Sequence, residues 1–205
     1  MKILDKLEQN TDEWADCRLG KVTGSKLHGL IVKRGTKKKI GFYELMAERI
    51  AVKEAWEDPM ERGHRLEDEA IKAFEEKTGK QVEQVGFCIH DKYPDIALSP
   101  DGLIKIKGKY KEAVEAKCLS SARHLQAYFE KQIPSEYEEQ VAQYFIVDED
   151  LETLHFVFYD PRITALPLHI IEITRVEYQG KADVYLEYQI NSLKEIDQML
   201  EELVF

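Results

Sequence analysis

The feature that most constrains this chain is a Pro-Asp-Gly turn between two apolar runs. Residues 96–98 predict a short buried strand, and the Ser-Pro-Asp-Gly turn at 99–102 leaves Asp101 at the end of that strand. Residues 112–119 predict a second strand. The segment 105–110 contains a glycine and is short enough for a hairpin that returns the second strand to the turn.

Charged side chains would meet where this hairpin closes. Because strand side chains alternate between faces, Glu115 and Lys117 share one face of their strand, and the hairpin brings Glu115 next to Asp101. Two carboxylates, together with a backbone carbonyl such as that of Ala116, are the oxygen ligands that Mg²⁺ prefers. Lys117 can orient or help deprotonate an attacking water and balance a phosphate. The spacing is typical of a metal-dependent nuclease site.

The acid-any-lysine triplet at 115–117 is not specific on its own. It is easily found in a chain that is 33% charged, and residues 75–77 repeat it in a segment that indicates solvated helix surface. Only the copy at 115–117 lies in an apolar strand after a Pro-Asp turn. From these residues alone, a nuclease site and a plain surface pattern both remain open.

Length and charge limit the classes of protein. The 205 residues suit one domain over 1–205, since no Pro/Gly/Ser-rich linker divides them. A net charge of −10 argues against a protein that coats nucleic acid by charge alone. A localised basic path remains possible along residues 33–39, which carry five lysines and arginines among Gly and Thr; the alternative is a solvated loop.

Cysteine use and hydropathy indicate a cytoplasmic protein. Cys17, Cys88 and Cys118 are widely spaced and odd in number, so we expect reduced thiols that pack in the core. No apolar stretch approaches the roughly 18 residues of a membrane span. The first residues carry no signal-peptide pattern, and we expect no membrane association.

The hydrophobic pattern predicts alternating helices and strands. Helices are expected at 11–19, 25–32, 42–53, 60–77, 123–131 and 182–203. Strands are expected at 82–90, 96–98, 103–106, 112–119, 153–159 and 168–174. Ser135 and Glu138 have the spacing of a capping box, which predicts a further helix to about residue 147. This order favours an α/β fold with a mixed central sheet flanked by helices.

Two predicted helices add polar side chains to the site. Glu67 flanks the apolar stripe of helix 60–77, where a carboxylate needs either a basic partner or a metal ion, and the spacing does not decide between them. Gln140 and Gln143 lie one turn apart on a face with Tyr137 and Tyr144. Amides there can hold a water or a phosphate, although helix glutamines are more often plain surface residues.

Several motifs in order resemble one known family. The chain resembles the phage lambda-type exonuclease, or YqaJ-type viral recombinase, family of the PD-(D/E)XK nucleases, from Trp14 to about residue 174. The motifs are Trp14, the segment Arg18-Leu19-Gly20-Lys21-Val22-Thr23-Gly24-Ser25, Gly63 with Glu67, Leu98-Ser99-Pro100-Asp101-Gly102, Glu115-Ala116-Lys117-Cys118, Tyr137 with Gln140-Val141, and Tyr159-Asp160-Pro161-Arg162. The resemblance implies a restriction-endonuclease-like core.

The resemblance also implies roles for individual residues. Asp101 and Glu115 match the metal-binding carboxylates, and Lys117 matches the catalytic lysine. Glu67 matches the helix glutamate that supports the metal site, and Gln140 matches the glutamine near the catalytic water. The implied cofactor is Mg²⁺, with Mn²⁺ as a substitute.

A second implied site is a pocket for a terminal 5′-phosphate. Arg18, Ser25 and Ser99 match its positions, and Arg123 would extend it. A guanidinium suits this role because it forks onto phosphate oxygens with two parallel bonds. Without the family, Arg18 would be a surface helix residue and Ser25 a helix N-cap.

The departures from the family pattern remove no functional group. Gly24 replaces a common alanine, and Leu119 replaces a frequent proline. The basic run 33–39 falls where the family carries a variable loop, so the grip on DNA and the processivity are the properties left in doubt.

The activity implied is that of a Mg²⁺-dependent 5′-to-3′ exonuclease. Such an enzyme degrades one strand of linear double-stranded DNA from 5′-phosphorylated ends and leaves 3′ overhangs for recombination. The implied partners are a single-strand annealing protein and further copies of the chain in a homotrimer ring. The implied setting is the cytoplasm of a bacterial host, encoded by a phage or prophage.

Other functions remain open from the sequence. One is a structure-specific or restriction-like DNA endonuclease, and another is a non-catalytic DNA-end-binding module on the same fold. A glycosidase with paired carboxylates is disfavoured, because it would leave Lys117 and Arg18 without a role.

Overall fold

A mixed four-stranded sheet forms the centre of the protein. The computed structural model describes residues 11–21, 26, 37–52 and 58–203. The sheet order is β3-β4-β5-β6, in which β4 and β5 run parallel and the outer pairs run antiparallel. The strands are β3 (Gly102–Ile106), β4 (Lys109–Lys117), β5 (Thr153–Tyr159) and β6 (Leu168–Thr174). A separate small sheet pairs β1 (Cys88–Ile89) with β2 (Ala97–Leu98).

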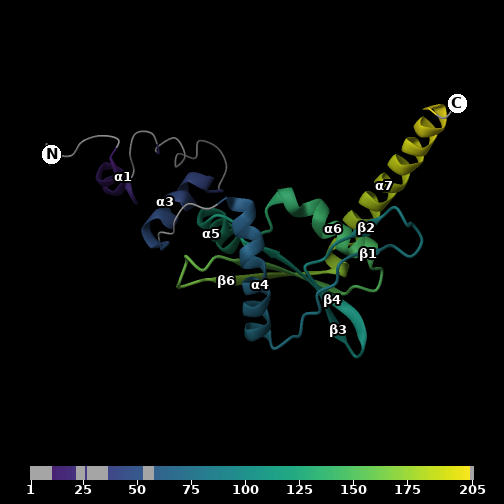
Figure 1. Ribbon diagram of the computed structural model, residues 1–205, viewed down its shortest axis with the longest axis horizontal. Helices are drawn as coiled ribbons and strands as arrows, with labels where there is room; N and C mark the ends of the chain where they lie inside the picture. The colour runs from purple at the N-terminus through teal and green to yellow at the C-terminus, as the bar shows by residue number, and fades with distance from the viewer. Residues whose placement is uncertain (1–10, 22–25, 27–36, 53–57, 204–205) are drawn as a thin grey trace.

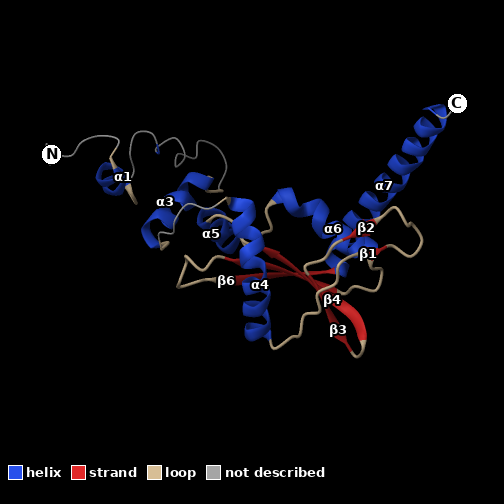
Figure 2. Cartoon of the chain, in the orientation of Figure 1, coloured by secondary structure: helices blue, strands red, loops and turns tan. Residues whose placement is uncertain are grey.

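Helices cover both faces of the central sheet, as the α/β pattern predicts (Figure 2). The helices of the structure are α1 (Asp12–Arg18), α3 (Ile40–Ile50), α4 (Pro59–Thr78), α5 (Ser121–Glu130), the 3₁₀ turn η1 (Ser135–Tyr137), α6 (Glu138–Val147) and α7 (Arg175–Leu203), of which α1 and α3 lie to one side of the sheet. On one face, Phe74 of α4 packs with Val114 and Val157. On the other face, α6 packs on Phe156 and Phe158. In Figure 1, α4 crosses the sheet and the far end of α7 extends away from it.

The predicted β3–β4 hairpin is confirmed. Lys107 and Gly108 form its turn with φ of 53° and 81°, and Ile106 pairs with Lys109. Positive φ at both turn positions matches the right-handed twist of the flanking strands. The register then places Gly102 opposite Val114. Asp101, which precedes Gly102, therefore comes beside Glu115, which follows Val114 on the antiparallel strand.

Residues 82–90 do not form the long strand that their sequence predicts. Glu83 exchanges backbone hydrogen bonds with Leu103 at 2.8 and 2.9 Å, and only Cys88–Ile89 pairs further along. Val82 packs against the α4 side of the core, whereas Val85 packs against the α6 side. Its backbone partners change from β3 at Glu83 to β2 at Cys88–Ile89, so the segment leaves the edge of the central sheet instead of running along it.

Two helix starts also differ from the prediction. The Ser135/Glu138 capping box is wrong, because Ser135 opens a 3₁₀ turn and α6 begins at Glu138 without a side-chain cap. Helix α7 begins at Arg175, before the predicted residue 182. There Glu177 accepts the Thr174 N–H at 3.0 Å, and Thr174 Oγ1 accepts the Glu177 N–H at 3.4 Å, a reciprocal cap. The helix predicted at 25–32 lies outside the described residues.

The cysteines and the helices bear on two further features of the chain. Cys17, Cys88 and Cys118 are free thiols. Cys88 and Cys118 pack against the core clusters, where burial raises the pKa of Cys118 to about 11, whereas α1, which carries Cys17, has no buried residue. Within the ranges that the structure describes, no helix combines the length and the apolar character that crossing a bilayer requires.

Candidate active site

The predicted charged residues meet at the carboxyl end of β4. Glu115 and Lys117 project from β4 on the side of α6, while Val114 and Ala116 face α4, as the predicted alternation requires. Asp101 directly precedes β3, the neighbouring strand. The structure therefore brings together the turn, the hairpin strand and α6 at one edge of the sheet.

Glu115 is a buried carboxylate with three side-chain donors. It is 1% exposed. Its Oε1 accepts from Lys117 Nζ and from Gln140 Nε2, each at 2.5 Å. Its Oε2 accepts from the Tyr144 hydroxyl, also at 2.5 Å. A buried charge is tolerated only with such partners, so these donors fix the position of Glu115.

Asp101 has much weaker support than Glu115. Its Oδ2 accepts the backbone N–H of Ala116 at 2.7 Å, and within the described residues its Oδ1 has no hydrogen bond. Burial, followed by the negative charges of Glu115 and Glu67, raises the pKa of Asp101 to about 7. At Asp101, the negative charges of Glu115 and Glu67 therefore outweigh the positive charge of Lys117.

Glu67 approaches this group from α4. Its charge acts on Asp101 and on Cys118, which places it on the α4 side of the carboxylates. Within the described part of the chain, Glu67 has no hydrogen bond or ion pair with a basic side chain. The sequence left open whether Glu67 pairs with a basic side chain or supports a metal ion, and the described residues provide no lysine or arginine partner.

The oxygen donors present suit a hard divalent cation. Among described residues, no three His, Cys, Asp or Glu side chains converge closely enough to hold a metal by themselves. The available donors are Asp101, Glu115 and the carbonyl of Ala116, whose N–H already points at Asp101. A strand residue directs its N–H and C=O to the same edge, so that carbonyl faces the same way. A cation would also offset the repulsion that raises the pKa of Asp101.

Comparison with known proteins gives the family. Residues 13–150 match the model of the YqaJ-like viral recombinase domain. The chain belongs to this family. No curated protein is a significant match to this YqaJ-like chain.

Solved structures share the fold of this YqaJ-like domain. An alkaline exonuclease (LHK-Exo) from Laribacter hongkongensis superimposes with a TM-score of 0.57 and 24% identity, covering 95% of this chain and 100% of its own. The same exonuclease in complex with dAMP gives a TM-score of 0.56 at 24% identity and the same coverage. At this identity the likeness establishes the fold.

The residues predicted for a phosphate pocket lie on separate elements. Arg18 ends α1, where its guanidinium carbon lies 4.3 Å from the Trp14 ring centroid. Ser99 is exposed just before Asp101. Arg123 is exposed on α5 and donates to Gln126 at 3.0 Å. Ser25 lies outside the described residues. A common pocket for these residues stays a prediction.

The end of the predicted basic run reaches Arg123. Lys37, Lys38 and Arg123 line a cavity of about 290 Å³, which continues to Pro134 and Ser135. Ser135 begins the turn η1, which ends at Tyr137, and the Tyr137 ring centroid lies 5.1 Å from Lys117 Nζ. The described part of the basic run, residues 37–39, therefore lies on the α5 side of the carboxylate site.

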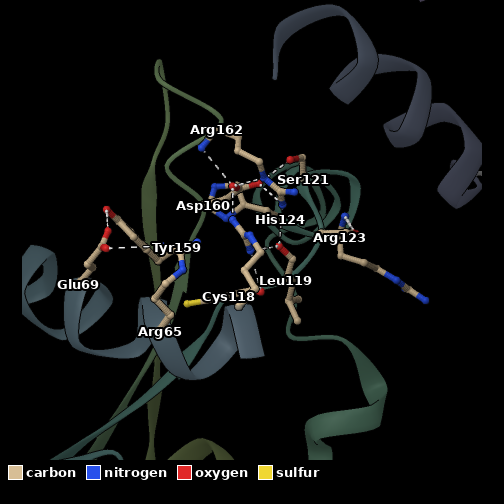
Figure 3. Close-up of polar contacts among 12 residues, drawn as sticks. Arg65, Glu69, Cys118, Leu119, Ser121, Arg123, His124, Tyr159, Asp160 and Arg162 are labelled. Atoms are coloured by element: carbon tan, nitrogen blue, oxygen red, sulfur yellow. Dashed lines mark hydrogen bonds and ion pairs between the residues drawn. The ribbon is translucent and has the colours of Figure 1, made fainter. Parts of the chain in front are cut away.

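A buried ion cluster anchors the chain directly after Lys117 (Figure 3). Asp160 is 0% exposed and accepts from Arg62 at 2.9 Å, from Arg162 at 2.8 Å and from Ser121 at 2.6 Å. Both arginines also donate to the Leu119 carbonyl, at 3.4 and 3.3 Å. Asp160 and Arg162 belong to a motif of the family resemblance for which the sequence indicated no role. In the structure they hold the connection from β4 to α5.

Proposed function

We propose that this protein is a Mg²⁺-dependent 5′-to-3′ exonuclease that degrades one strand of linear double-stranded DNA, with Mn²⁺ as a substitute ion. The observation that carries the proposal is the arrangement of Glu115, Lys117 and Gln140 beside Asp101. Membership of the YqaJ-like viral recombinase family supports it, as does the fold shared with a solved alkaline exonuclease.

The cation would be held by Asp101, Glu115 and the Ala116 carbonyl, with Glu67 in support. When bound, it supplies a Lewis acid that polarises the scissile phosphodiester. We expect Lys117 to offset negative charge that develops on the phosphate, because Glu115 holds its ammonium at this edge of the sheet.

Gln140 would place the attacking water. Its Nε2 donates to Glu115, and within the described residues its amide oxygen has no partner. That oxygen can accept a hydrogen bond from a water and orient a lone pair toward phosphorus. Glu115 thus positions both the lysine and the glutamine of the proposed reaction.

The DNA end would be held through its 5′-phosphate by Arg18, Ser25, Ser99 and Arg123. The cavity lined by Lys37, Lys38 and Arg123, which Glu130 and Glu136 also line, would offer the adjoining strand three basic side chains despite the net charge of −10. In this proposal the product is a duplex with 3′ overhangs for single-strand annealing. We further propose that the protein forms a homotrimer ring and works with an annealing protein, in the cytoplasm of a bacterium that carries the phage or prophage.

Digestion of matched DNA substrates tests this function. A linear duplex with 5′-phosphate ends, the same duplex with 5′-hydroxyl ends and a covalently closed circle are incubated with and without EDTA. We expect mononucleotides from the 5′ end of the phosphorylated duplex, slower attack on the hydroxyl ends, an intact circle and no activity in EDTA. Cleavage of the circle would instead indicate an endonuclease, and undiminished activity in EDTA would contradict the metal mechanism.

A further inference from the structure

The Tyr144 hydroxyl lies between the two segments that carry the proposed metal ligands. Tyr144 projects from α6 and is 1% exposed. Its hydroxyl lies 2.5 Å from Glu115 Oε2 and 3.3 Å from the Val114 carbonyl, and it accepts the backbone N–H of Asp101 at 3.4 Å. One side chain thus contacts both β4 and the turn before β3.

The hydroxyl has a single proton, and Glu115 is its nearest acceptor. A phenol is ordinarily protonated at neutral pH, so the Tyr144 hydroxyl remains a donor. Packing does not require this hydroxyl, because the Tyr144 ring already lies in the apolar cluster around α6 and a phenylalanine ring would fill the same space.

The donors of Glu115 are divided between its two oxygens. Lys117 and Gln140 both contact Oε1, whereas among the described residues Oε2 has Tyr144 as its donor. The terminal torsion of a glutamate is broad, so contacts at one oxygen leave the carboxylate free to pivot. A donor at the second oxygen fixes its plane.

We infer that Tyr144 is a positioning residue for the proposed metal centre, whose hydroxyl sets the plane of the Glu115 carboxylate and ties it to the Asp101 turn so that both carboxylates face one cation. The inference rests on the proposed function for the identity of the centre. It assigns to Tyr144 no contact with DNA and no proton transfer.

The substitution Tyr144→Phe tests the hydroxyl alone. Tyr178→Phe is the matched control, since the Tyr178 hydroxyl donates at 3.0 Å to the Glu138 carbonyl and, among the described residues, bonds to neither Asp101 nor Glu115. Partners that orient a metal ligand typically alter metal affinity by about tenfold or more. We expect Tyr144→Phe to weaken Mn²⁺ binding, measured by calorimetry without DNA, by about that factor.

The same variant separates positioning from a merely structural role. We expect the Mg²⁺ concentration for half-maximal hydrolysis to rise with Tyr144→Phe while KM for the DNA end stays unchanged, and excess Mg²⁺ to recover most of kcat. Tyr178→Phe should leave both within about twofold. A Tyr144→Phe protein that melts like wild type, binds Mn²⁺ equally and needs no more Mg²⁺ would overturn the inference.

A second measurement avoids any dependence on how the variant folds. With 3-fluorotyrosine at position 144 of the otherwise native chain, the ¹⁹F resonance should shift as Mg²⁺ is added, whereas the label at position 178 should not respond. A silent label at 144 under saturating Mg²⁺ would overturn the inference. If the wild-type protein hydrolyses no DNA with any divalent ion, the proposed function fails; if it hydrolyses DNA and position 144 is silent, this inference fails alone.

Discussion

Two aspartates at strand ends, Asp101 before β3 and Asp160 after β5, have opposite surroundings. Asp160 accepts from two arginines and a serine, at 2.6 to 2.9 Å for the shortest contact of each. Asp101 accepts from one backbone N–H and lies near Glu115 and Glu67.

The pKa values differ in the same sense. Burial alone would raise the pKa of Asp160, yet hydrogen bonds from Arg162 and Ser121 hold it below its usual range. Burial and neighbouring carboxylates raise that of Asp101 to about 7. The protein supplies the counter-charge for the aspartate that holds its fold together. In our proposal, an added cation balances the charge of the other aspartate.

Removing the charge of Asp101 should have the largest effect on activity. Asp101→Asn keeps an acceptor for the Ala116 N–H but loses a metal ligand. A cation contributes several kcal/mol to the transition state, so we expect DNA hydrolysis to fall by about a thousandfold or more. Steady-state digestion of 5′-phosphorylated duplex measures this, with the melting temperature as the control for folding. Activity within tenfold of wild type would show that Asp101 is not required for hydrolysis, and the proposed contrast with Asp160 would be wrong.

The matched change Asp160→Asn should act on stability instead. It removes the buried carboxylate that Arg62 and Arg162 both contact, and breaking such a buried pair typically costs about 3–5 kcal/mol. We expect the free energy of unfolding in urea to fall by that amount, while Mn²⁺ binding to the folded protein stays within twofold. A variant as stable as wild type would show that the ion cluster does not anchor the chain after Lys117.

Added metal should distinguish the two sites by thermal shift. Binding to the folded state alone stabilises by about 2.7 kcal/mol at one hundred times Kd. We expect Mg²⁺ to raise the melting temperature of wild type and of Asp160→Asn, and EDTA to reverse the rise. Asp101→Asn should show little change. An equal rise in all three proteins would place the ion elsewhere.

The pH dependence of stability should report on Asp160. Its folded pKa lies below its ordinary value of 3.8, so its contribution is complete above that pH and is lost as the pH falls through the folded value. The stability gap between wild type and Asp160→Asn should therefore be constant from neutral pH to about pH 4 and close below it. A gap that closes near pH 7 would assign the titration to another group.

The smallest effect is expected at the exposed cavity. Arg123→Ala should weaken DNA binding and reduce its salt dependence by roughly one unit of slope, the mark of one lost phosphate contact. Melting temperature should not change, because Arg123 is exposed. The control is Lys105→Ala at the hairpin, an exposed lysine paired with Glu83. Equal effects from the two variants would argue against a DNA path through this cavity.

Local sequence patterns predicted the sheet well. β5 and β6 begin and end at the predicted residues, because both are apolar runs bounded by turn residues. Alternation along β4 correctly placed Glu115 and Lys117 on one face. The prediction at 82–90 failed because the backbone partners of this segment lie on two different strands: Glu83 pairs with β3, whereas Cys88–Ile89 pairs with β2.

The side-chain contacts that the sequence did not predict depend on long-range register. Tyr144 has the pattern of an ordinary core residue of α6, and only the packing of that helix on the sheet brings its hydroxyl to Glu115. Arg62 meets Asp160 across 98 positions of sequence. Local propensity carries no signal for such pairs, whereas motif order was sufficient to group Asp101, Glu115 and Lys117.

We propose that one divalent cation binds between Asp101 and Glu115. A crystal of the wild-type protein grown with Mn²⁺ and measured at the manganese absorption edge would show where the ion lies. We expect an anomalous peak in contact with both carboxylates and the Ala116 carbonyl, and no peak there in crystals of Asp101→Asn. A fully occupied Mn²⁺ elsewhere, with no density between the two carboxylates, would contradict it.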